Sequence, residues 1–245
     1  MVPLGELAYT AVMNSYRLRR MVAGAAVMVL TLTIILLQPD NYQYQPQSLN
    51  SPTKQNPQSD AAKQALDTLP VKGRADKTDY SRSKFHDGWQ LVGNCDMRNI
   101  ILARDMYDKV VDLNCKVLKG KLDDPYTGQL INFVRGPSTS ADVQIDHVVA
   151  LSDAWQKGAQ QLSPLARQSL ANDPLNLLAV DGDQNQKKSA SDAASWLPPF
   201  KPFRCAYVAR QVAVKQRYRL WVTAAEKLAI ATVLEQCPGQ QLPKP

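Results

Sequence analysis

The chain has 245 residues and a formal net charge of +7, with 44% apolar and 21% charged residues. This composition excludes a chain that is disordered throughout, because it is normal for a globular domain with a hydrophobic core. The positive charge favours an acidic partner, such as nucleic acid or an anionic surface, although net charge says nothing about the fold.

The N-terminal end predicts a membrane-targeting segment. Residues 1–20 are a short basic segment with Arg17, Arg19 and Arg20, and residues 21–37 are an uncharged apolar run. This run is near the lower length limit for a membrane span and slightly longer than a usual signal-peptide core. Because no Ala-x-Ala-like cleavage site follows, we expect a signal anchor rather than a cleaved signal peptide, with an exported C-terminal body.

Residues 38–75 predict a flexible linker. They are rich in Gln, Asn, Pro and Ser and show little apolar periodicity. Such a segment buries too little apolar surface to offset the entropy lost on ordering. We therefore expect the folded domain to cover residues 76–245.

The cysteines favour disulfide bonds over a zinc site. Cys95, Cys115, Cys205 and Cys237 include no close Cys-x-x-Cys pair of the kind that structural zinc sites use. In the oxidising surroundings of an exported domain, we expect Cys95 to pair with Cys115 and Cys205 with Cys237, because each pair brackets one helical segment. Four reduced, buried thiols are the alternative.

The first half of the domain predicts a helix, a hairpin and a strand. Apolar residues at helical spacing predict an amphipathic helix over Asp96–Leu113. The turn sequence Asp124–Gly128 predicts a hairpin over Leu122–Phe133. A loop at residues 136–140 follows, and the β-branched segment Val143–Leu151 predicts a strand.

The second half predicts a helical insertion, one more strand and three helices. The insertion covers residues 152–171, with Ser152 as N-cap and a second helical part from Pro164. The elements after it are a strand at Leu177–Val180, a turn at Asp181–Asp183, and helices at Asn185–Ser195, Arg204–Tyr218 and Thr223–Glu235.

An Asp-His pair interrupts the predicted strand Val143–Leu151. Asp146 and His147 stand where a buried strand would carry apolar residues, while Asn176 and Asn185 begin the next strand and the next helix. A tight turn folds that helix back beside the first strand, so that Asp146, His147 and Asn185 can face one site. A carboxylate and an amide oxygen suit a hard cation such as Mg²⁺, and a neutral imidazole can take a proton from water. This pattern predicts metal-assisted hydrolysis of a phosphodiester.

At these residues the chain resembles the HNH, or ββα-metal, nucleases. The matching segments are DHVVALSDAW, NDPLNLLAV and DGDQNQKKSASDA, which supply an Asp-His start, a central asparagine and a closing Asn-x-x-Lys. The phrases CDMRNIILARD, DPYTG and RCAYVARQVAVK extend the similarity over Tyr80–Leu234. They resemble exported proteins of Gram-positive, chiefly actinobacterial, type, related to the nuclease domain of modification-dependent restriction enzymes. The resemblance implies an α+β fold, in which a ββα-metal (HNH) core with flanking helices follows one N-terminal transmembrane or signal helix.

The resemblance also implies a role for each residue of the site. His147 is the general base that activates water, and Asp146 and Asn185 are the metal ligands. Asn176 holds the imidazole or its loop in position, and Lys188 contacts a substrate phosphate. We expect one divalent ion, Mg²⁺ or Mn²⁺ rather than Zn²⁺, because the ligand atoms are oxygens.

The chain departs from the family pattern in two places. Ser189 stands where many members carry a further histidine ligand, and the helical insertion separates the base from the central asparagine. Structural roles also compete with the functional ones. The alternatives are turn capping for Asn176, helix N-capping for Asn185, and a solvated helix face for Lys187 and Lys188.

The remaining basic residues leave two interpretations open. Arg82, Arg98, Arg104 and Arg135 line a basic groove for nucleic acid, or they pair with nearby aspartates. His86 is expected to be a surface or packing residue.

The favoured function is an exported metal-dependent endonuclease that hydrolyses DNA with weak sequence preference. DNA is the expected substrate, the membrane is a further partner if the N-terminal helix is uncleaved, and no protein partner is predicted. The expected location is the cell envelope outside the cytoplasm, anchored or secreted. The alternatives are a non-catalytic surface protein that binds DNA or an anionic polymer, and an envelope adaptor that holds a partner.

Overall fold

The structure, a computed structural model, describes residues 61–85 and 87–243. The predicted segments 1–20 and 21–37, the first part of the predicted linker and His86 lie outside these residues. Among the described residues, no helix is both long enough and apolar enough to cross a membrane.

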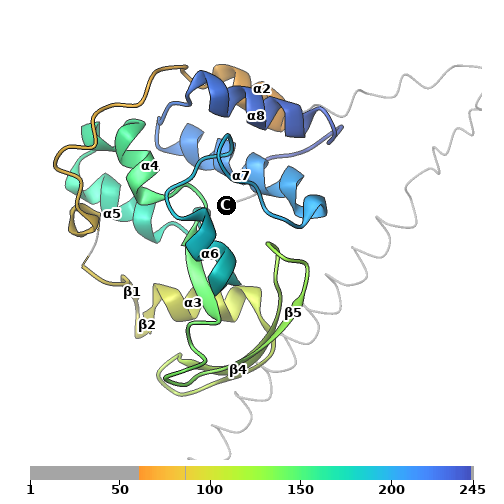
Figure 1. Cartoon of the computed structure of the whole chain (residues 1–245). Helices are drawn as coiled ribbons and strands as arrows, with labels where there is room; N and C mark the ends of the chain where they lie inside the picture. Colours follow the sequence, from red (N-terminus) through yellow and green to blue (C-terminus); the bar gives the residue numbers. More distant parts are fainter. Residues whose placement is uncertain (1–60, 86, 244–245) are drawn as a thin grey trace, which may run out of the picture. The chain divides into compact units, whose positions relative to one another are not determined.

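Helices and short antiparallel sheets make this part of the chain a mixed α+β fold, which confirms the predicted class (Figure 1). There are three sheets in this part of the chain: β1 with β2, then β3-β4-β5 in that order, and β6 with β7. The helices are α2 (Ala61–Thr68), α3 (Met97–Asp105), α4 (Leu151–Gln156), α5 (Pro164–Asn172), α6 (Gly182–Lys188), α7 (Arg204–Arg217) and α8 (Ala224–Leu234). The strands are β1 (Leu91–Val92), β2 (Cys95–Asp96), β3 (Tyr107–Val111), β4 (Val117–Asp123), β5 (Leu130–Val134), β6 (Val143–His147) and β7 (Leu177–Asp181). Short 3₁₀ helices cover Arg82–Lys84, Ala159–Gln161 and Lys201–Phe203.

β6, β7 and α6 form a strand-strand-helix unit, with α6 in contact with both strands (Figure 1). Helix α6 begins directly after β7, because Asp181 caps it by accepting a hydrogen bond from the Gln184 amide at 2.8 Å. The Gly182 amide donates to the Asp142 carbonyl at 2.9 Å. A Cβ at position 182 would lie 2.1 Å from the Ala141 carbonyl oxygen, so only glycine allows this close approach.

Helix α3 contacts both the β3-β4-β5 sheet and the β6-β7 pair. Ile101 and Leu102 of this helix are fully buried, in a core shared with Val117 and Phe133 of the first sheet and Ala179 of the second. This packing fixes the β4-β5 hairpin relative to β6, the strand that carries Asp146 and His147.

Helix α2 lies inside the range that the sequence predicts as a linker. Ala62, Ala65 and Leu66 pack into the core next to α7 and α8, and Val71 forms a bridge to Val222. The folded part of the chain therefore includes residues before 76. The sequence predicts a linker here because the composition is polar, but two alanines and one leucine at helical spacing are enough to bury one face of a short helix.

The predicted helix Asp96–Leu113 is wrong in its second half. Helix α3 ends at Asp105, and β3 follows as a strand paired with β4. Tyr107, Val110 and Val111 are residues that favour strands, and pairing with a neighbouring strand overrides the helical spacing of the apolar positions.

The boundaries of two further helices differ from the prediction. The insertion begins with α4 at Leu151, so Ser152 is not its N-cap, and Ser163 caps α5 instead. The predicted helix Asn185–Ser195 starts earlier, at Gly182, and ends at Lys188, where Ser189 adopts a φ of 50°. This left-handed conformation stops the helix.

The predicted turn at Asp181–Asp183 is wrong, because Asp181 is the last residue of β7 and Gly182 is the first of α6. Most of the remaining predicted elements agree with the structure. The predicted hairpin is β4-β5, the loop at 136–140 contains neither helix nor strand, and the second predicted strand is β7. The two C-terminal helices are α7 and α8, and Thr223 caps α8 by accepting from the Glu226 amide at 3.1 Å. β6 begins as predicted at Val143 but ends at His147, so the predicted end at Leu151 is wrong: Leu151 is the first residue of α4.

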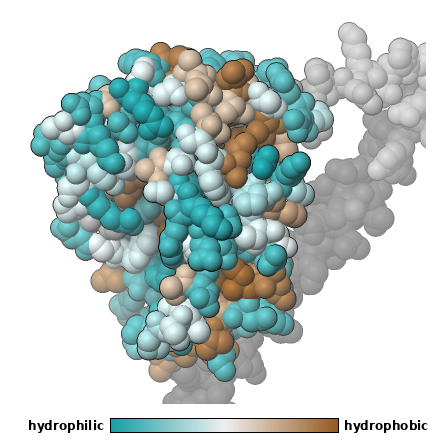
Figure 2. Space-filling view, in the orientation of Figure 1, coloured by the Kyte–Doolittle hydropathy of each residue, from teal (hydrophilic) through white to brown (hydrophobic). Residues whose placement is uncertain are grey.

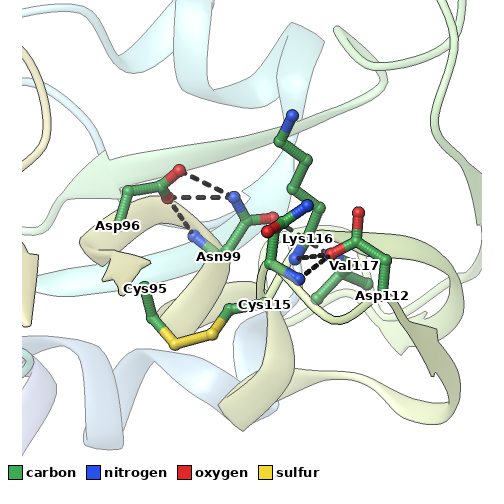
Figure 3. The surroundings of a disulfide bond; sticks show 8 residues. Cys95, Asp96, Asn99, Asp112, Cys115, Lys116 and Val117 are labelled. Carbon is green, nitrogen blue, oxygen red and sulfur yellow. Dashed lines mark hydrogen bonds between the residues drawn. A yellow bond between two sulfur atoms is a disulfide. The ribbon is translucent and has the colours of Figure 1, made fainter. Parts of the chain in front are cut away.

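The two disulfides join Cys95 to Cys115 and Cys205 to Cys237, the pairing favoured by the sequence. Figure 3 shows that the first bond lies beside Asp96, which caps α3 by accepting from the Asn99 amide at 2.7 Å. This bond ties the start of α3 to the turn between β3 and β4. The second bond ties the start of α7 to the end of α8.

Replacing Cys205 and Cys237 together by serine is expected to lower the free energy of unfolding by roughly 3–4 kcal/mol. The bond closes a loop with a sequence separation of 32, which restricts the unfolded chain. Urea unfolding followed by circular dichroism measures the change. Wild-type and double-variant proteins should differ under non-reducing conditions and approach each other in dithiothreitol. Equal midpoints without reductant would show that the bond is absent or does not stabilise the fold.

Candidate active site

The Asp146 carboxylate lies at the centre of the site and is 4% exposed. One carboxylate oxygen, Oδ1, accepts a hydrogen bond from Lys188 Nζ at 2.9 Å, and the other accepts from the Tyr126 hydroxyl at 2.5 Å. Lys188 Nζ also donates to the His147 carbonyl at 2.9 Å. A cation and a hydroxyl therefore hold this carboxylate from β6 in one orientation.

Tyr126 reaches Asp146 from the turn between β4 and β5. The Asp124 carboxylate accepts from the Thr127 amide at 2.7 Å and from the Asp181 amide at 2.8 Å, which ties this turn to the end of β7. Burial, reinforced by the negative charge of Asp146, raises the pKa of Tyr126 well above 10. The hydroxyl therefore stays protonated and remains a hydrogen-bond donor to the carboxylate.

His147 is held in one tautomer by the backbone. Its Nε2 lies 2.9 Å from the Ala171 carbonyl oxygen. A carbonyl can only accept a hydrogen bond, so Nε2 carries the proton and Nδ1 is the basic nitrogen of the neutral ring. The ring also stacks on Trp89, with the two centroids 5.9 Å apart and the planes 9° from parallel. This arrangement suits a general base, which needs a basic nitrogen in a fixed orientation.

Asn176 connects the two ends of the helical insertion. Its side-chain oxygen accepts from the Val149 amide at 2.8 Å, and its Nδ2 donates to the carbonyls of Val149 at 3.3 Å and Leu170 at 3.2 Å. Leu170 precedes Ala171, whose carbonyl binds the imidazole of His147. Asn176 therefore contacts the backbone on both sides of the insertion and supports the imidazole through it.

Asn185 projects from α6 toward β6. Its Nδ2 donates to the Gln144 side-chain oxygen at 2.8 Å. Asn185, Asp146 and His147 line one open hollow of about 520 Å³. In the part of the chain that the structure describes, no hydrogen bond ends on the side-chain oxygen of Asn185. Figure 2 shows hydrophilic residues at the centre of the view, at the place where Figure 1 shows α6.

The atoms around the hollow suit a divalent cation that prefers oxygen ligands. Asp146 and Asn185 would be the ligands, because a carboxylate oxygen that accepts one hydrogen bond still has a second lone pair. The described residues contain no group of three His, Cys, Asp or Glu side chains that could hold a metal. Two oxygen ligands from the protein would suit an ion that keeps several of its waters, as Mg²⁺ does.

The position of Lys188 does not fit its predicted contact with a substrate phosphate. Its side chain is 0% exposed and its ammonium group is bound to Asp146 and to the His147 carbonyl. Reaching a phosphate in the hollow would leave the Asp146 carboxylate without its cation. Lys187, the neighbouring residue, is exposed and forms the solvated face that the sequence offers as the alternative.

The four arginines singled out in the sequence divide into two groups. Arg82 is exposed and lines the hollow beside Asp146, His147 and Asn185. The other three bind elsewhere in the fold. Arg98 donates to the Ser140 and Val143 carbonyls, Arg104 pairs with Asp105, and Arg135 donates to the Val117 carbonyl and to Asn99. Among these four, Arg82 alone lines the hollow.

Comparison with known proteins gives one family and one close relative. Residues 94–233 match the C-terminal domain of GmrSD restriction endonucleases. An uncharacterized secreted protein of the fungus Arthroderma benhamiae is 37% identical over 189 residues, which cover 76% of this chain and 90% of that protein. No solved structure gives a significant match. Because this relative is fungal, the comparison does not support the expected actinobacterial branch.

Lys188→Met is expected to lower the free energy of unfolding by about 3–5 kcal/mol, because it leaves the buried Asp146 carboxylate without a cation. Lys187→Met is the matched control. It removes the same charge from an exposed side chain, and its effect should stay within about 0.5 kcal/mol. Urea unfolding of both variants measures the difference. Equal effects would contradict the buried ion pair.

Tyr126→Phe is expected to cost about 1.5–3 kcal/mol at neutral pH, because Asp146 loses a hydrogen bond to a charged group. This cost should shrink as the pH rises above about 10. Above about pH 10 the unfolded chain releases the Tyr126 proton, whereas the folded wild type keeps it because the pKa of Tyr126 is raised. The stability of the wild type therefore falls as the pH rises. The Phe variant has no hydroxyl at this position, so its stability lacks this pH dependence. Unfolding midpoints from pH 7 to 11 measure both effects. A difference independent of pH would contradict the raised pKa.

Proposed function

The chain belongs to the family of the C-terminal domain of GmrSD restriction endonucleases, and from this membership we propose that it is a metal-dependent endonuclease that hydrolyses DNA. Its core is of the HNH, or ββα-metal, type, with β6, β7 and α6 as the three elements. The observation that carries the proposal is the meeting of Asp146, His147 and Asn185 in one open hollow, from a strand and from a helix.

His147 acts as the general base. With Nε2 held by the Ala171 carbonyl, Nδ1 takes a proton from the attacking water. The imidazolium that forms is stabilised by the same carbonyl, which continues to accept from Nε2–H. Asn176 keeps this carbonyl in place by binding the backbone of Leu170.

Asp146 and Asn185 hold the divalent ion, Mg²⁺ or Mn²⁺. When bound, the ion supplies positive charge that stabilises the phosphoryl oxygens and the departing oxygen. Lys188 and Tyr126 keep the Asp146 carboxylate in position during the reaction. Arg82 replaces Lys188 as the contact to a substrate phosphate, because its guanidinium is exposed beside the hollow.

Recognition of this kind reads the backbone of the nucleic acid more than its bases. A general base, one ion and an arginine all act on the phosphate, and phosphate contacts carry no sequence information. We therefore propose weak sequence preference.

The enzyme acts outside the cytoplasm. The two disulfides need oxidising surroundings, and the relative from Arthroderma benhamiae is a secreted protein. Anchoring through residues 21–37 stays a prediction.

A plasmid-nicking assay tests the proposed activity. The purified protein should convert supercoiled plasmid to the nicked form with Mg²⁺ or Mn²⁺, and EDTA should stop the reaction. His147→Ala should slow nicking by about 10²–10⁴-fold, because it removes the general base. Thr232→Ala, an exposed position on α8, is the control and should nick at the wild-type rate.

Each outcome of this assay separates the hypotheses. Equal rates for wild type and His147→Ala would overturn the role of His147. Nicking that survives EDTA would overturn the metal dependence. Plasmid binding without nicking, across Mg²⁺ and Mn²⁺, would instead support the non-catalytic DNA-binding alternative.

A further inference from the structure

Gln144 lies beside Asn185 in the hollow but has no role in the proposed chemistry so far. We propose that Gln144 is a positioning residue that decides which end of the Asn185 amide faces a bound cation. This inference rests on the proposed function, because it concerns the proposed metal ligand Asn185.

The Asn185 amide has two chemically different ends of similar shape. Its oxygen can bind a cation, whereas its NH₂ group carries partial positive charge and repels one. The side chain can present either end by a half-turn. Here the NH₂ group donates to the Gln144 side-chain oxygen at 2.8 Å, so the oxygen is the end left for another partner.

The orientation of Gln144 is in turn set by the backbone. Its own NH₂ group lies 3.4 Å from the Ala141 carbonyl oxygen, which can only accept a hydrogen bond. If Gln144 turned over, its oxygen would face that carbonyl and its NH₂ group would face the NH₂ group of Asn185. Both contacts would be repulsive. The favourable arrangement is therefore the one in which Asn185 donates to Gln144 and Gln144 donates to the Ala141 carbonyl.

Gly182 makes room for this chain of bonds. A Cβ at this position would meet the Ala141 carbonyl oxygen at 2.1 Å and Gln144 Nε2 at 3.1 Å. The same glycine begins α6, the helix that carries Asn185. Alternation along β6 also puts Gln144 on the same side of the strand as Asp146. Strand β6 thus carries Gln144 together with Asp146, and Gly182 brings the start of α6, the helix of Asn185, against the backbone that fixes Gln144.

Calorimetric titration of the protein with Mn²⁺, without DNA, tests the inference directly. Gln144→Leu should weaken Mn²⁺ binding about two- to tenfold, the value of one hydrogen bond that orients a ligand. Gln186→Leu removes an exposed glutamine from the same hollow and should keep the wild-type affinity.

A second background separates orientation from a general structural effect. In an Asn185→Asp protein, either end of the side chain presents an oxygen, so orientation no longer matters. Adding Gln144→Leu to this protein should therefore not weaken Mn²⁺ binding. The same loss in both backgrounds would overturn the inference, because it would show that Gln144 only supports the local fold.

The remaining outcomes distinguish this inference from the proposed function. If wild type binds Mn²⁺, Asp146→Ala does not, and Gln144→Leu binds as wild type does, the metal site stands and the role of Gln144 falls. If wild type binds no Mn²⁺, the proposed metal site falls and the inference falls with it.

Discussion

The buried Asp146 carboxylate is the point at which three parts of the chain must meet. Strand β6 carries the carboxylate, α6 supplies the cation of Lys188, and the β4-β5 turn supplies the hydroxyl of Tyr126. Taking a carboxylate and an ammonium out of water costs several kcal/mol per ion, which only close pairing and further hydrogen bonds can offset. The site therefore forms only when hairpin, strand and helix are all in place. Its geometry is a consequence of tertiary packing.

A second buried set of charges fixes the elements that follow the site. Lys157, the residue that follows α4, lies 2.7 Å from carboxylate oxygens of Asp153, Asp192 and Glu226. It therefore joins α4, the segment after α6, and α8. Burial lowers the pKa of Lys157, but the neighbouring carboxylates outweigh this effect and raise it above its ordinary value. The ammonium thus stays charged. Arg74 also pairs with Asp153 and Asp192, which attaches a segment near the start of the described domain.

The sequence predicts those features whose causes are local. The turn residues around Tyr126 predict the hairpin, and Thr223 predicts the start of α8. The order of strands and helix predicts that Asn185 lies near Asp146. The pairing of Lys188 with Asp146 could not be predicted, because a lysine on a short polar helix is usually exposed. Lys188 is buried here because its partner Asp146 is buried in the fold. Gln144 gives no signal either. Its importance comes from its contacts with the Ala141 carbonyl and with the Asn185 amide, and the second of these exists only in the folded chain.

The helical insertion between His147 and Asn176 is more than a tolerated addition. A long insertion adds little closure entropy when its ends are held together, and Asn176 holds them through Val149 and Leu170. The insertion also ends in Ala171, whose carbonyl orients the imidazole of His147. The proposed base thus receives its tautomer from the inserted segment itself. A change in the length of the insertion that moved this carbonyl would alter the tautomer and orientation of the base, so the insertion and the base cannot vary independently.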